Sequence, residues 1–131
     1  MTGADLKALR NAFAAAAQRV YDSWDPVQGW CGNEEIGGGG ICHLIANEMA
    51  DVASEVGFDV ATVNAQVGEN HVWFVAKADD GVWMVDVPWY AYERGGGYSW
   101  TKIPDVTITG GDVLIHRISS DPADFDDFWE G

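Results

Sequence analysis

Residues 71–87 read HVWFVAKADDGVWMVDV, two apolar stretches on either side of a short polar segment. Their period of two and their content of valine and tryptophan predict β-strands at His71–Lys77 and Val82–Val87. Asp79-Asp80-Gly81 between them is typical of a hairpin turn. Asp86 lies inside the second apolar stretch, where a charged side chain is costly unless it is paired. We therefore expect an antiparallel hairpin in which Asp86 has a partner.

The position of the turn decides whether His71 can be that partner. A turn centred between Ala78 and Asp79 would put His71 directly opposite Asp86, on the same face of the sheet. A tight turn at Asp80-Gly81 would instead put Asp86 opposite Val75, about 13 Å along the strand from His71. The sequence leaves both registers open.

Two helices are predicted upstream of the hairpin. Apolar residues recur at helical spacing over Leu6–Trp24, after a capping-box-like pair formed by Thr2 and Asp5, and the helix is expected to end near Asp25-Pro26. A second apolar stripe predicts a helix that begins around Ile41 and stops at Gly57.

Further strands are predicted at Phe58–Gln66 and Val113–Ile118. Helices followed by a meander of strands indicate an α+β fold, with N-terminal helices packed on an antiparallel sheet in one domain spanning residues 1–131. The acidic tail Asp121–Gly131 also contains aromatic residues, so it either docks loosely through them or frays. Residues 25–40 are expected to form a loop, and the aromatic segment Pro88–Thr101 either walls a substrate cleft or only covers the core.

The charge of the chain restricts its partners. Twenty-one acidic residues stand against seven basic ones, giving a formal charge of -14 over 131 residues. Such a field repels phosphate backbones and anionic lipid, so we expect neither nucleic-acid nor membrane binding. The charge is either a solvated coat that favours solubility or a mimic of a nucleic-acid strand that occupies a basic partner.

No signal peptide and no run of about 18 apolar residues is found. The two cysteines, Cys31 and Cys42, are too few for a disulfide framework and fit a reducing compartment, so a cytoplasmic location is expected. A Cys31–Cys42 bridge is the alternative.

Cys42 follows the four glycines Gly37–Gly40 and falls in the first turn of the second predicted helix. A helix N-terminus favours negative charge, and cysteine attacks as the thiolate. The glycines leave the backbone open to a substrate chain, and the N–H groups near Gly40 could face an oxyanion. Alternatively, the glycines form a flexible turn and Cys42 is a small buried hydrophobic residue.

His71 and Asp86 turn this cysteine into a candidate catalytic group. A thiol nucleophile needs a base, and the base needs an acceptor that holds its tautomer. The same three residues could bind zinc, but the chain has neither a Cys-x-x-Cys pair nor a His-Glu-x-x-His helix, so no metal or other cofactor is expected. His43 diverges from Cys42 by about 100° around the helix, and His116 is expected to be a core residue beside Leu114 and Ile118.

The segment Gly37–Pro88 resembles the transglutaminase-like branch of the papain-like cysteine fold. Members carry a cysteine that opens a helix, a strand beginning His-Ala-Trp and a strand ending Val-Asp-Pro; here Cys42, His71-Val72-Trp73 and Val85-Asp86-Val87-Pro88 correspond. The resemblance implies that Cys42 is the nucleophile, His71 the general base and Asp86 the orienting acid. Arylamine N-acetyltransferases look similar in Gly39-Gly40-Ile41-Cys42, Gly57-Phe58-Asp59-Val60 and Val85-Asp86-Val87.

Some features depart from these families. His43 follows the cysteine where transglutaminase-like proteins commonly carry an apolar or aromatic residue. Residues 28–33 echo the start of the papain signature, but Glu34 stands where its nucleophile would be. We interpret the echo as chance and keep Gln28, with Gly40 and Trp89, as a weak candidate for oxyanion or substrate contacts.

We therefore expect a thiol-dependent hydrolase that acts on a peptide, isopeptide or glutamine amide of a protein or peptide substrate through an acyl-enzyme. A deamidase or acyltransferase would use the same first step. The competing hypothesis is a non-enzymatic acidic protein that inhibits a basic partner.

Overall fold

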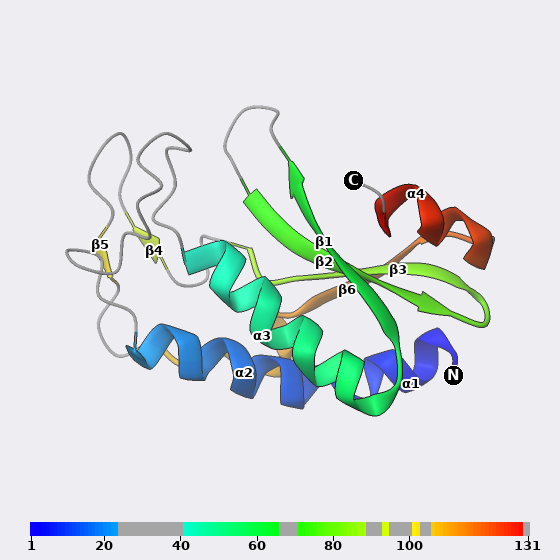
Figure 1. Ribbon diagram of the computed structural model, residues 1–131. Helices are drawn as coiled ribbons and strands as arrows, with labels where there is room; N and C mark the ends of the chain where they lie inside the picture. Colours follow the sequence, from blue (N-terminus) through cyan, green and yellow to red (C-terminus); the bar gives the residue numbers. More distant parts are fainter. Residues whose placement is uncertain (24–40, 66–70, 89–92, 95–100, 103–105, 130–131) are drawn as a thin grey trace.

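A four-stranded antiparallel sheet forms the centre of the structure, in the spatial order β1-β2-β3-β6 (Figure 1). The strands are β1 (Asp59–Ala65), β2 (His71–Ala78), β3 (Gly81–Asp86) and β6 (Leu114–Ser119), and a separate pair consists of β4 (Glu93–Arg94) and β5 (Thr101–Lys102). The structure is a computed structural model that describes residues 1–23, 41–65, 71–88, 93–94, 101–102 and 106–129. The four strands of the sheet match the predicted ones to within one residue at each end.

The helices confirm the α+β class. They are α1 (Gly3–Lys7), α2 (Arg10–Ser23), α3 (Ile41–Val56) and α4 (Asp126–Trp129), with short 3-10 helices η3 (Gly110–Asp112) and η4 (Pro122–Phe125). The prediction of one continuous N-terminal helix was wrong. The Leu9 amide bonds to the Leu6 carbonyl at 3.0 Å, a tighter turn than in an α-helix, and this separates α1 from α2. None of the helices in these segments is both long and apolar enough to cross a membrane.

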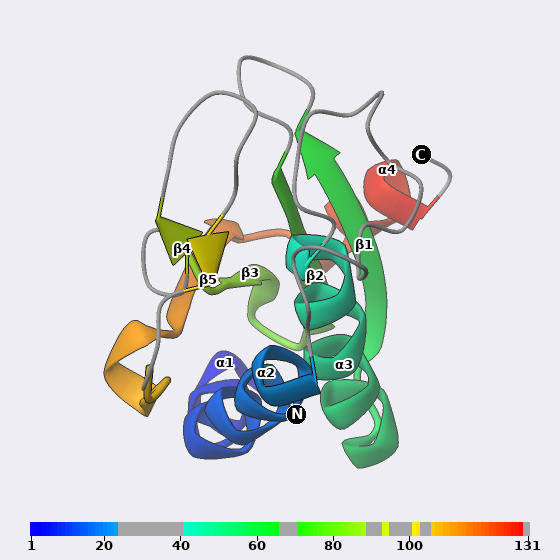
Figure 2. The same ribbon diagram turned by 90° about the vertical axis from the view of Figure 1, so that its left-hand side faces the viewer.

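Helices cover both faces of the sheet (Figure 2). On one face, α2 and α3 bury the main core, where Phe13 of α2 meets Phe74 of β2 edge to face with ring centroids 5.6 Å apart. On the other face, Val75 and Val82 pack with Phe125, which is 4 % exposed. The acidic tail therefore docks through its aromatic residue.

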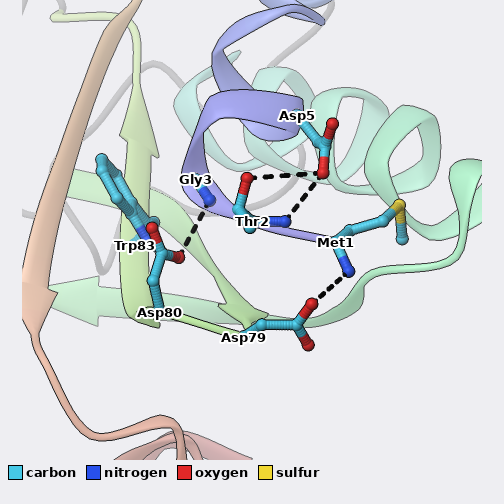
Figure 3. Close-up of polar contacts among 7 residues, drawn as sticks. All are labelled: Met1, Thr2, Gly3, Asp5, Asp79, Asp80 and Trp83. Carbon is cyan, nitrogen blue, oxygen red and sulfur yellow. Dashed lines mark hydrogen bonds and ion pairs between the residues drawn. The ribbon is translucent and has the colours of Figure 1, made fainter.

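The tip of the β2–β3 hairpin is held against the N-terminus (Figure 3). The Met1 ammonium lies 2.7 Å from the Asp79 carboxylate. The Gly3 amide and the Trp83 indole N–H both donate to Asp80 Oδ1, at 2.9 and 3.1 Å. A Cβ on Gly3 would lie 2.0 Å from the Trp83 ring, so only glycine allows this close approach. The hairpin is thus fixed at the end opposite to His71 and Asp86.

The predicted capping box at the start of α1 is present. The Thr2 amide donates to Asp5 Oδ2 at 2.8 Å, and the Thr2 hydroxyl lies 3.4 Å from the same oxygen. This bond satisfies a backbone N–H that the helix itself leaves unpaired.

Candidate active site

Three elements bring the sequence-predicted residues to one end of the sheet. Cys42 is the second residue of α3, His71 is the first residue of β2 and Asp86 is the last residue of β3. In an antiparallel hairpin, the first residue of one strand and the last residue of the next lie at the same end of the sheet. Figure 1 shows the first turn of α3 on the same side of the molecule.

The hairpin register differs from both expected registers. Ala78 pairs with Gly81 and Phe74 with Val85, so the turn is a two-residue loop. Continuing this register by one residue puts Asp86 opposite Trp73, which makes His71 and Asp86 diagonal neighbours. Diagonal side chains on one face remain within reach of each other.

Gly81 accounts for the position of the turn. Its φ of 140° is in the region that favours glycine, and a Cβ there would lie 2.0 Å from the Ser119 carbonyl oxygen. Gly81 is the first residue after the loop, where β6 passes closely, and not the second residue of a tight turn as one expected register required.

His71 and Asp86 nevertheless make direct contact. His71 Nε2 lies 2.7 Å from Asp86 Oδ1. Asp86 is 8 % exposed and is the one buried polar or charged residue in the described part of the chain. A buried carboxylate requires a hydrogen-bonding partner, and the imidazole supplies it. The prediction that Asp86 is paired, with His71 as its partner, is therefore met.

The pKa of His71 shows the combined effect of its surroundings. Burial disfavours the charged ring and lowers the pKa, but hydrogen bonds to Asp86 and Cys42, together with their charges, raise it to about 10. At neutral pH His71 is accordingly an imidazolium. Since Asp86 binds Nε2, Nδ1 is the ring nitrogen that remains for a second partner.

Cys42 is a free thiol with a partly exposed side chain. It is neither half of a disulfide nor a fully buried hydrophobic residue, the two alternatives that the sequence left open. Its side chain lies close enough to His71 to help raise the pKa of the imidazole. The described segments hold no group of three His, Cys, Asp or Glu side chains arranged to bind a metal.

The remaining candidates fall into two groups. Gln28, Cys31, Gly40 and Trp89 lie outside the described residues, as do most of residues 88–101. His43 is partly exposed and lines a surface cavity.

The prediction that His116 is a core histidine was wrong, because its side chain is exposed. Ile118, on the same face of β6, is 44 % exposed, and Ile115 is the residue of this strand that enters the main core.

Sequence reasoning missed one residue beside the site. The Trp73 ring lies with its centroid 6.0 Å from that of His71, tilted by 38°. The two residues are separated by one position on β2, so the period of two could have placed them on one face. Trp73 forms an aromatic wall next to the imidazole.

A scan against protein-family models finds no match, and searches of curated proteins and of solved structures find none either.

Proposed function

We propose that the chain is a thiol-dependent hydrolase of peptide, isopeptide or glutamine amides, with a papain-like core of the transglutaminase-like type. The observation that carries this proposal is the convergence of Cys42, His71 and Asp86, in which the imidazole bonds to the carboxylate at 2.7 Å and also interacts with the thiol. Nucleophile, proton carrier and orienting acid are the three groups that such chemistry requires.

In the first step, the Cys42 sulfur attacks the carbonyl carbon of the amide and forms a C–S bond. The raised pKa of His71 means that the ring already holds its proton before the substrate arrives. When the C–N bond breaks, the departing nitrogen takes the proton from His71, so the ring serves first as general acid. The products are a free amine and a thioester on Cys42.

In the second step, water attacks the thioester carbon and gives a proton to the now neutral His71. The C–S bond breaks, a carboxylic acid leaves, and the thiolate and imidazolium are restored. Asp86 keeps Nε2 bonded throughout, so that Nδ1 remains directed at the reacting atoms. An amine in place of water would complete a transfer reaction by the same steps.

The test is the alkylation rate of Cys42 by iodoacetamide at pH 6, in a Cys31→Ser background with the labelled peptide identified by mass spectrometry. A thiol of ordinary pKa is less than about 1 % thiolate at that pH. Paired with imidazolium, Cys42 is expected to react at least about tenfold faster than a model thiol, and His71→Ala should abolish the excess. A rate equal to that of the model thiol and unchanged by His71→Ala would remove the enzyme proposal.

The formal charge of -14 favours a second candidate, an acidic protein that occupies a basic partner. Cys42→Ser separates the two candidates. The substitution abolishes the function of a thiol hydrolase, whereas it leaves the function of an acidic inhibitor intact.

A further inference from the structure

The outer edge of β1 is open in the part of the chain that the structure describes. β1 pairs with β2 along its whole length, and no other described strand pairs with its second edge. Figure 2 shows β1 at the side of the sheet, between α3 and α4. Such an edge presents backbone N–H and C=O groups to any extended chain that can approach it.

A groove follows this edge. One cavity, of about 570 Å³, lies between His43 and Asn47 of α3, Asn64 of β1 and Phe128 of α4. A neighbouring cavity, of about 530 Å³, also borders Asn47 and Phe128, so the two adjoin along β1. Their β1 residues run over positions 60–64, the length of about five residues of an added strand.

The groove is acidic. Asp127 borders the first cavity and Asp51 the second, and no lysine or arginine is among the described residues that line either. The whole chain, including these residues, carries a formal charge of -14. An occupant with positive side chains is attracted by this charge, whereas a second copy of the same acidic chain is repelled.

One end of the groove lies at the candidate active site. Asn64 pairs with Val72 and Ala65 with His71, so the C-terminal end of β1 is beside the proposed catalytic histidine. On α3, His43 in the groove directly follows Cys42. A chain that extends along β1 is therefore led toward the thiol.

We propose that this groove binds an extended basic peptide segment of the substrate as an added strand on β1. The proposal rests on the hydrolase function above, for which it names the substrate class. Backbone bonds to β1 supply affinity, and the acids select lysine or arginine side chains.

The test uses the full chain with Cys42→Ser, which cannot turn over substrate, and a fluorescein-labelled peptide of alternating valine and lysine, six residues long. Fluorescence anisotropy should show binding that weakens at least about tenfold in the double variant Asp51→Asn/Asp127→Asn, and that falls as salt rises. Glu55→Gln is the matched control, because Glu55 is exposed on α3 and borders neither cavity. In the Cys42→Ser chain, Glu55→Gln should leave the affinity for the peptide unchanged.

Two further peptides test the mode of binding. Glutamate in place of lysine should abolish binding, and methylation of alternate backbone nitrogens should weaken it at least about tenfold, since a methylated nitrogen cannot donate to β1. Amide hydrogen exchange of β1 should slow when the lysine peptide is present.

Several outcomes would overturn the proposal: equal binding of the lysine and glutamate peptides, equal loss in the groove and control variants, no protection of β1, or a concentration-dependent dimer that pairs through β1. Circular dichroism of each variant excludes loss of the fold as the cause. Fast iodoacetamide labelling of Cys42 with no peptide binding would refute the groove and leave the hydrolase proposal standing.

Discussion

Replacement of Asp86 by asparagine tests the centre of the site, because it removes one negative charge with little change of shape. A His71 pKa of about 10, against an ordinary value of 6.5, corresponds to a preference for the charged ring of about 5 kcal/mol. Asp86 and Cys42 share this effect, while burial acts against it. Without the carboxylate, two of the causes that raise the His71 pKa are lost, and we expect it to fall well below its value in the unaltered protein.

The same change alters how stability depends on pH. The His71 pKa is raised on folding, so its contribution is fully present below about pH 6.5 and is lost as the pH rises toward 10. The unaltered protein should lose up to about 5 kcal/mol of unfolding free energy between pH 6 and pH 10 from this group. Asp86→Asn should be less stable at pH 6 and should show a much smaller loss over that range.

Two measurements check these values. NMR titration of the imidazole carbons follows the three histidines separately, with His43→Gln and His116→Gln used to assign the signals. Urea unfolding at pH 6 and pH 10 gives the free energies. The reasoning is refuted if His71 titrates near 6.5 in the unaltered protein, or if Asp86→Asn leaves its titration and the pH dependence of stability unchanged.

Two substitutions test the framework that positions the site, both by urea unfolding. Gly81→Ala should destabilise the protein by about 2 kcal/mol or more, because φ at this position is 140° and the new Cβ would meet the Ser119 carbonyl. Gly111→Ala is the control, since its Cβ would make an ordinary contact at 3.6 Å. Equal losses of unfolding free energy in the two variants would refute this explanation. Phe125→Ala should cost about 3 to 5 kcal/mol if the docked tail is part of the cooperative unit, against less than about 0.5 kcal/mol for Val56→Ala, since Val56 is 47 % exposed. A loss below about 1 kcal/mol for Phe125→Ala would mean that the tail undocks independently.

The strands and α3 could be predicted from the sequence because local signals agree with the global fold. The period of two around Phe74, the turn residues before Gly81 and the apolar stripe that ends at Gly57 each depend on near neighbours in the chain. The same patterns also indicated that Asp86 needed a partner, and His71 is that partner.

What could not be predicted depends on contacts between distant segments. The two-residue loop is fixed by the close approach of β6 to Gly81, and a period of two alone does not state which register results. Periodicity also does not show which face of an edge strand is covered, so His116 was placed on the wrong side of β6. The groove along β1 is formed by α3 and α4, which are separated by some 70 residues in the chain. No motif in the sequence predicts that these two helices lie on either side of β1.

The open edge of β1 has a consequence for handling the protein in acid. Repulsion between highly charged copies keeps unpaired edges apart at neutral pH, but the isoelectric point is near 4.2. As the solution approaches that value, the carboxylates take up protons and the repulsion vanishes while the backbone groups of β1 stay exposed. Isoelectric precipitation of this protein should accordingly produce β-rich aggregates that seed one another, and purification should stay near neutral pH, where the copies repel each other and the His71 contribution to stability is largely kept.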